Sequence, residues 1–154
     1  MKHTLFFSLI LFLLTGQIYA QPGMNPQKRK EIKEMQLKFI INKLQLTEKE
    51  KAAFIPVYKT FTAKRESLFF EKHKTMRNFK QNSLNMSNDD LLNLADECVN
   101  INFRLAQLDK QYNKEFKKVL PPIKVILLYQ AENEFKRDLI RKMHHKQGGK
   151  MRPK

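Results

Sequence analysis

An apolar residue recurs at steps of three and four from Leu91 to Val119, with a break in the pattern only near its end. This spacing places one apolar seam on one face of an α-helix, as in coiled coils. Neither proline nor glycine interrupts residues 90–119, so we expect one helix about 45 Å long at a rise of 1.5 Å per residue. No strand pattern competes elsewhere in the chain, and the sequence therefore predicts an all-α fold.

Three further helices are predicted from the same periodicity. The first runs from Lys28 to about Gln45, the second from Thr47 through Phe79, and the fourth from Ile123 through Met143. Thr47 and Glu50 match a capping box, and Ser87 has the properties of a helix cap. Pro56 should kink or split the second helix, because proline removes a backbone donor. Pro121 and Pro122 should separate the last two helices.

The N-terminus has the three parts of an export signal. A basic start at residues 1–3 is followed by an apolar run from Leu5 to Leu14 and by a small residue, Ala20. The run is too short to cross a bilayer, which needs about 20 residues. We expect cleavage after Ala20; an uncleaved anchor and a buried helix are the alternatives. The expected organisation is a signal peptide at 1–20, a flexible lead at 21–27, a helical domain at 28–146 and a basic tail at 147–154.

Charge is unevenly distributed. The chain has 30 Lys and Arg against 15 Asp and Glu, a formal net charge of +15. Residues 87–118 hold 5 basic and 6 acidic groups, whereas residues 21–86 hold 15 and 6. An exported protein does not meet the nucleoid, so we expect no nucleic acid partner but an acidic polypeptide, envelope polymer or membrane surface. The alternative is a mixed surface that only aids solubility.

Two stretches together resemble a known family. One is Leu46-Thr47-Glu48-Lys49-Glu50, and the other runs from Glu115 to Pro122 and leads into the last helix. With the export signal and the helical pattern, they are similar to the Spy/CpxP family of small periplasmic helical proteins, which carry two LTxxQ motifs. Glu50 takes the place of Gln in the first motif. In the second, Leu120 is kept, Pro121 replaces Thr, and Lys124 stands where Gln would be.

The resemblance spans about residues 28–143 and implies a fold, a location and a role. It implies four helices in a long curved hairpin, paired antiparallel into a cradle-like homodimer in the periplasm. Members of the family hold unfolding polypeptides without ATP, damp an envelope-stress sensor, or sense metals. We therefore expect an ATP-independent chaperone. The alternative is a stress- or metal-responsive regulator that acts with a sensor kinase or an ECF-type sigma-factor system.

The second helix carries the candidate client-binding residues, because it places charge beside apolar side chains. Positive charge attracts acidic segments of unfolded chains, and Met and Phe can repack against varied clients. For Phe69, Met76 and Phe79, the alternative is that they fill the core. A third function, contact with an anionic membrane surface, would use the same basic faces. The candidates are Lys64, Arg65, Phe69, Lys72, Met76, Arg77 and Phe79.

Metal-binding and catalytic signals are weak. His144 and His145 are adjacent and so point about 100° apart on a helix, whereas His73 and Met76 lie one turn apart. Neither set has an obvious third ligand, so we predict no metal site. Cys98 lies on the seam, where a buried thiol is favoured over a bridge between subunits. No GxSxG, HExxH or phosphate loop is present, so we expect neither catalytic residues nor a cofactor.

Overall fold

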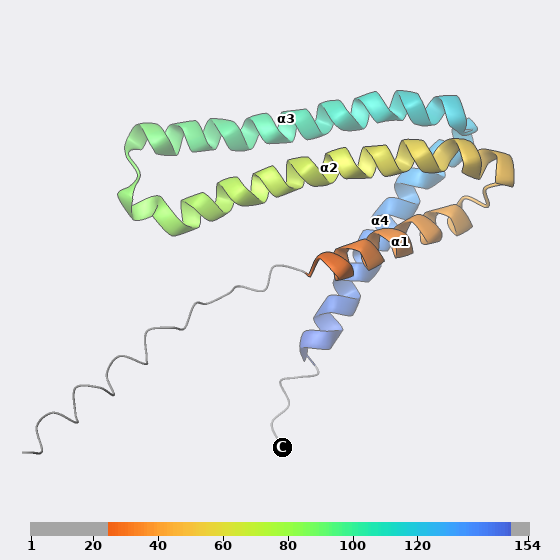
Figure 1. The fold of residues 1–154 in the computed structure, drawn as a ribbon, viewed down its shortest axis with the longest axis horizontal. Helices are drawn as coiled ribbons and strands as arrows, with labels where there is room; N and C mark the ends of the chain where they lie inside the picture. Colours follow the sequence, from red (N-terminus) through yellow and green to blue (C-terminus); the bar gives the residue numbers. More distant parts are fainter. Residues whose placement is uncertain (1–24, 149–154) are drawn as a thin grey trace, which may run out of the picture. The chain divides into compact units, whose positions relative to one another are not determined.

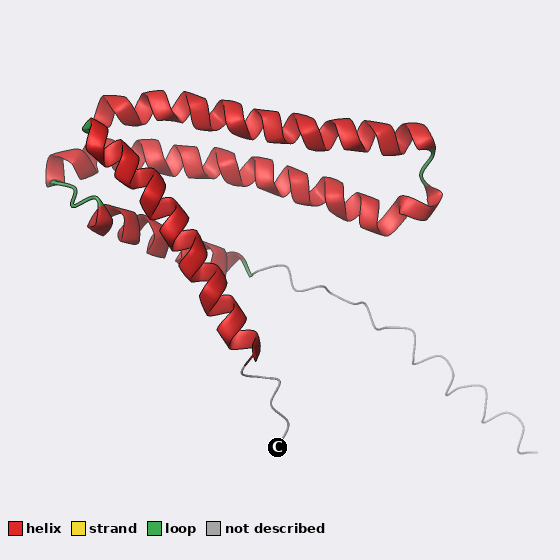
Figure 2. Cartoon of the chain, turned by 180° about the vertical axis from the view of Figure 1, so that it is seen from behind, coloured by secondary structure: helices red, strands yellow, loops and turns green. Residues whose placement is uncertain are grey.

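The computed structural model describes residues 25–148, with side chains up to residue 142. The helices are α1 (Pro26–Lys43), α2 (Glu48–Asn82), α3 (Asn88–Val119) and α4 (Pro122–Gly148), and a short 3-10 turn, η1 (Ser83–Asn85), joins α2 to α3 (Figure 1). No strand occurs in this part of the chain, so the all-α prediction is confirmed (Figure 2). The expected signal peptide, residues 21–24 and residues 149–154 lie outside the described residues.

The chain divides into two units, residues 1–34 and residues 35–154, and the boundary falls within α1. In the first unit, α1 begins at Pro26, two residues earlier than predicted, so the expected flexible lead was wrong for Pro26 and Gln27. The cause is local: the Asn25 side chain accepts a hydrogen bond from the backbone N–H of Gln27 at 2.9 Å, and proline suits the first helical position.

In the second unit, a reverse turn at residues 44–46 joins α1 to α2. The backbone N–H of Gln45 donates to the Asn42 carbonyl and that of Leu46 donates to the Ile41 carbonyl, which is the pattern of a Schellman motif. Gln45 has a φ of 47°, a left-handed conformation that glycine more often supplies. The turn lets α1 end at Lys43 and orients Leu46 into the core, where it is 6% exposed.

Both predicted caps are confirmed. Thr47 and Glu50 form a reciprocal capping box at the start of α2. Ser87 and Asp90 form a second one at the start of α3. Each box satisfies backbone N–H groups that a helix start leaves without partners, and so fixes where the helix begins.

Pro56 does not split α2, which runs unbroken from Glu48 to Asn82. Of the two expected outcomes, a kink or a split, the split does not occur, because Pro56 and Ala52 are exposed and the carbonyl that loses its donor lies on the solvent side. The hydroxyl of Thr60 donates to the Pro56 carbonyl at 2.9 Å and adds a local partner one turn further on.

The buried core lies at one end of the hairpin that α2 and α3 form. Three residues of α2 are buried, Phe54, Tyr58 and Phe61, and none further along that helix. Their rings pack against Tyr112 and Phe116 of α3 in tilted and edge-on arrangements, with ring centroids 5.2–6.3 Å apart. Residues from the other helices and the turns complete this core: Ile40, Leu44, Leu46, Leu108, Leu120, Val125, Leu128 and Ala131.

Contacts in the second unit hold α1 and α4 together at this end. Phe39 and Phe135 have ring centroids 5.7 Å apart. Lys43 pairs with Glu134 at 2.8 Å. The remote half of the hairpin, by contrast, buries only Ile101 and otherwise relies on half-buried side chains.

We expect Phe54→Ala to lower the free energy of unfolding by about 3–5 kcal/mol, because it leaves a cavity in the aromatic core. Phe54 is fully buried, whereas Phe70, a matched control on the same helix, is 61% exposed. Phe70→Ala should change the stability by less than about 0.5 kcal/mol. Urea unfolding followed by circular dichroism measures both, and similar losses in the two variants would contradict this assignment of the core.

Candidate functional site

The two motif segments meet where α1, α2 and α4 join. Leu46 and Leu120 are both buried in the same core. The Glu50 carboxylate accepts from the Thr47 backbone at 2.8 Å and from Lys124 Nζ at 2.7 Å. Lys124 Nζ also donates to the Gln45 carbonyl at 3.0 Å. Glu50 and Lys124, which stand at the Gln position of the two LTxxQ-like motifs, therefore pair and join the start of α4 to the start of α2.

The Lys124 ammonium, and secondly the Thr47 backbone, lower the pKa of Glu50. A carboxylate whose pKa is lowered on folding stabilises the fold above its unfolded pKa, and that stability is lost as pH falls through the folded pKa. The Glu50–Lys124 link therefore contributes at neutral pH and fades in acid.

We expect Lys124→Met to lower the melting temperature at pH 7 and to lose this deficit as Glu50 becomes protonated in acid. Lys51→Met is the control, because Lys51 pairs at 2.7 Å with Glu48, whose side chain is 90% exposed. That exposed pair should contribute little. Melting curves from pH 7 down to acid compare the variants; an equal deficit in both would show that the link to α4 is no more important than a surface pair.

A second polar group lies inside the second unit, between α2, α3 and α4. Tyr58 donates its hydroxyl proton to Glu132 Oε1 at 3.0 Å. Arg65 lies 3.7 Å from Glu132 and 4.0 Å from Asp109. Burial is the main cause that raises the pKa of Glu132, against the opposing charge of Arg65. Burial also raises the pKa of Tyr58, which stays protonated and acts as the donor.

Because folding raises the pKa of Glu132, its effect on stability changes with pH in the opposite direction to that of Glu50. Its contribution is complete below the unfolded pKa and is lost as pH rises through the folded pKa. We expect Glu132→Gln, which stays neutral, to gain stability relative to the natural chain between about pH 4 and neutral pH. Denaturant titrations at several pH values measure this difference. A difference that stays constant or reverses with pH would contradict it.

Four of the seven candidate client-binding residues contact other side chains of the hairpin. The Arg65 guanidinium lies over the rings of Phe61 and Phe69 as well as near Glu132. The other three contacts are those of Lys64 over the Tyr112 ring at 5.5 Å, Lys72 with Asn102 Oδ1 at 2.8 Å, and Met76 with the Cys98 sulfur at 3.6 Å.

The remaining three candidates, Phe69, Arg77 and Phe79, are exposed, and so are several apolar neighbours that were not predicted as candidates. Phe69 is 41% and Phe79 40% exposed, and Met76 is 46% exposed in spite of its contact with Cys98, so none of the three is buried in a core. Phe70, 61% exposed, was missed because α2 was interpreted from its inward seam, and Leu84, 99% exposed, because residues 81–86 were interpreted as a polar break. Arg77, exposed, lines an open groove of about 750 Å³ between the remote halves of α2 and α3, with Lys74, Met86, Leu94 and Glu97 among the other lining residues.

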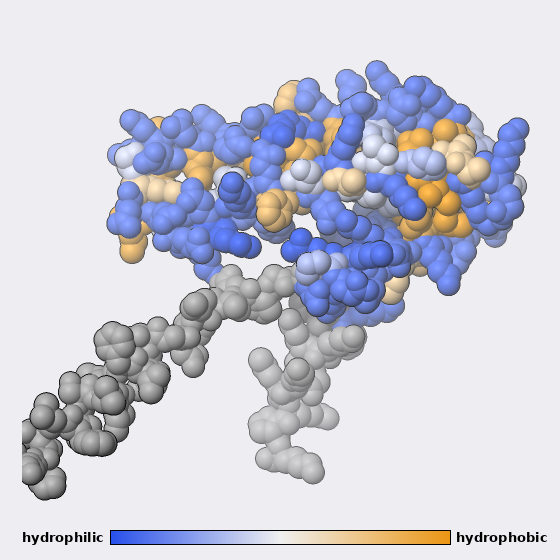
Figure 3. All heavy atoms as spheres, viewed as in Figure 1, coloured by the Kyte–Doolittle hydropathy of each residue, from blue (hydrophilic) through white to orange (hydrophobic). Residues whose placement is uncertain are grey.

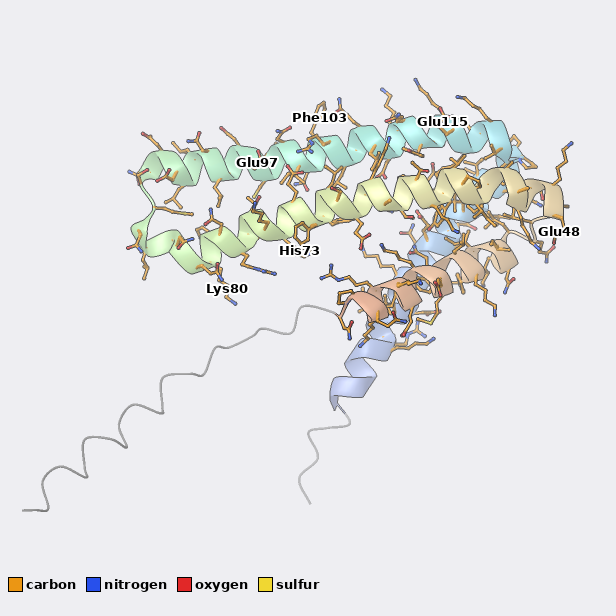
Figure 4. The ribbon with its side chains drawn as sticks, in the orientation of Figure 1. Glu48, His73, Lys80, Glu97, Phe103 and Glu115 are labelled. Carbon is orange, nitrogen blue, oxygen red and sulfur yellow. The ribbon has the colours of Figure 1, made fainter. Side chains whose placement is uncertain are left out.

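Two helical rows of α2 combine apolar and cationic side chains. Phe69, His73, Met76 and Lys80 follow each other at steps of four, three and four. Phe70, Lys74 and Arg77 form a second row at the same spacing. Figure 4 shows His73 and Lys80 on the side of α2 that is turned away from α3. We call the following six residues the α2 surface: Phe69, Phe70, Lys74, Met76, Arg77 and Lys80.

The face seen in Figure 3 is mostly hydrophilic, with apolar residues gathered between α2 and α3. Among residues 67–82 of α2 four are basic and only Glu71 is acidic, and Glu71 pairs with Arg104 of α3. Lys74, Arg77 and Lys80 make no ion pair with the described residues. Their charge therefore remains available to an anionic partner.

The weaker metal signals gain no geometric support. His73 is exposed, and its neighbour Met76 contacts Cys98 instead. Among the described side chains, no three of His, Cys, Asp and Glu lie close enough together to hold a metal ion. The side chains of His144 and His145 lie outside those described. Cys98 is half-buried rather than buried, because the remote half of the seam is only partly covered.

Comparisons with family models, curated proteins and solved structures find no match to this chain. None of the helices in residues 25–148 combines the length and apolar character that crossing a bilayer requires.

Proposed function

We propose that this chain is an exported, periplasmic chaperone that binds unfolded polypeptides without ATP through the α2 surface. The observation that carries the proposal is the mixture on that surface of apolar side chains, 41–61% exposed, and cations that lack partners in the described chain. The export signal expected at residues 1–20 supports the location. An unfolded polypeptide offers both apolar and acidic groups, so it complements both features.

The packing of the hairpin also supports this function. Beyond Phe61, no residue of α2 is buried, so the α2 surface is backed by half-buried side chains and polar contacts rather than by a core. Few buried apolar contacts allow side chains to rearrange, which suits binding to varied sequences. Long-range attraction by the cations would speed association with acidic segments, whereas the apolar contacts would prolong the lifetime of the complex.

A membrane surface and an envelope signalling protein are the competing partners. A helix that lies on an anionic membrane separates its apolar side chains from its cations on opposite faces, whereas each row of the α2 surface mixes the two kinds. A signalling partner would present one defined surface, and nothing in the α2 surface selects one shape. The α2 surface, which combines charge with adaptable side chains, favours unfolded chains.

The test is aggregation of a denatured acidic client, such as reduced α-lactalbumin, followed by light scattering. The double variant Arg77→Glu with Lys80→Glu should weaken protection severalfold, because it replaces two cations that attract the acidic client with two anions that repel it. Lys49→Glu with Lys59→Glu makes the same change in net charge near the other end of α2 and should leave protection largely intact. Protection should also fall as salt rises, because exposed charges are screened.

Two results would contradict the proposal. One is a failure of the natural chain to suppress aggregation at stoichiometric concentration. The other is an equal effect of the two double variants, which would show that net charge rather than the α2 surface governs binding. Flotation with anionic vesicles under the same conditions identifies a membrane surface binder, since such a chain would bind vesicles but leave the client unprotected.

A further inference from the structure

The last two helices leave an open groove between them. The backbone of Leu120, which follows α3, is extended, with a φ of −130° and a ψ of 144°, and α4 begins two residues later at Pro122. The two helices diverge from this corner (Figure 1 and Figure 2). The groove has a volume of about 780 Å³, a size typical of ligand-binding pockets. We call it the α3–α4 groove, and its lining includes Lys110, Asn113, Leu120, Val125, Ile126 and Tyr129.

The end of the groove at this corner is aliphatic. Leu120 is 4% and Val125 3% exposed, so both belong to the buried core, whereas Ile126 beside them is 56% exposed. None of these three side chains has a polar atom. The backbone N–H groups of Lys124 and Val125 both donate to the Pro121 carbonyl, at 2.9 and 3.2 Å. This end therefore favours an aliphatic ligand over one that needs hydrogen bonds.

The other end of the groove is polar and basic. Tyr129 donates its hydroxyl proton to Asn113 Oδ1 at 3.0 Å, so the amide nitrogen of Asn113 is the donor that this pair offers to a ligand. Lys110 lies one turn before Asn113 on the same face of α3, is exposed, and makes no ion pair with the described residues. The acidic residue of the lining, Asp109, already has Arg65 4.0 Å away. The uncompensated charge at this end is therefore positive.

We propose that the α3–α4 groove binds one medium-chain fatty acid, with its carboxylate at Lys110 and Asn113 and its alkyl chain along Leu120 and Ile126. An ammonium group forms a strong, charge-assisted hydrogen bond with a carboxylate. From Lys110 to Leu120, α3 rises about 15 Å, which suits an extended alkyl chain of roughly ten carbons. Lys117, which also lines the groove, can cover the alkyl chain with its aliphatic stem while its charge stays in water.

Other occupants fit the groove less well. A membrane surface would touch the exposed Lys110 and Ile126 but would not enter the space between two helices. A polypeptide would place its own N–H and C=O groups against aliphatic side chains that cannot bond them, at a cost in free energy. The groove lies at the opposite end of the hairpin from the α2 surface, so this inference does not rest on the proposed chaperone function.

Isothermal titration calorimetry of the purified chain with decanoate, kept below its micelle-forming concentration, tests the proposal. We expect one site per chain with a Kd well below about 1 mM. Lys110→Glu should raise the Kd about tenfold or more, because it replaces the attracting cation with an anion. Lys114→Glu is the matched control, since Lys114 is also exposed on α3 but does not line the groove. The control should change the Kd by less than about twofold, because its charge is screened by solvent.

A second pair of variants tests the aliphatic end. Ile126→Gln should raise the Kd severalfold, because Ile126 lines the groove and loses its contact with the alkyl chain. Ile123, 65% exposed on the same helix, does not line the groove, so Ile123→Gln should leave the Kd nearly unchanged. Circular dichroism checks that all four variants keep their helical content.

Several results would overturn the proposal. One is the absence of binding at about 1 mM decanoate. Another is an equal loss of affinity in Lys110→Glu and Lys114→Glu, which would indicate attraction by net charge alone. Decylamine, which has the same alkyl chain but the opposite charge, should bind about tenfold more weakly, and equal binding would contradict recognition of the carboxylate. Binding to anionic vesicles without binding to monomeric decanoate would assign this face to a membrane surface instead.

Discussion

The aromatic cluster at one end of the hairpin is the interaction on which the remaining structure depends. Phe54, Tyr58 and Phe61 of α2 pack against Tyr112 and Phe116 of α3, and buried residues of α1 and α4 complete the core. Nearly all of the buried apolar side chains lie there, and burial of apolar surface is the main stabilising contribution to a fold. The remote half of the hairpin has no comparable core. Polar links such as Arg104–Glu71 and Lys72–Asn102 hold its two helices in register instead.

Electrostatic contacts fix how the last helix joins this cluster, and they respond to protons in opposite directions. Lys124 bonds Glu50 and lowers the pKa of that carboxyl, whereas burial raises the pKa of Glu132. Acid therefore weakens the first contact but favours the protonated form of the second. The contributions of the two carboxyl groups to stability therefore change in opposite directions with pH.

Local features of the fold could be predicted from the sequence, whereas contacts between distant segments could not. The caps at Thr47 and Ser87 and the α3 seam depend on residues within a few positions of each other. The Lys124–Glu50 bond joins residues 74 positions apart, and no local pattern specifies it. Arg65 looked free on its own helix because its partners lie on α3 and α4.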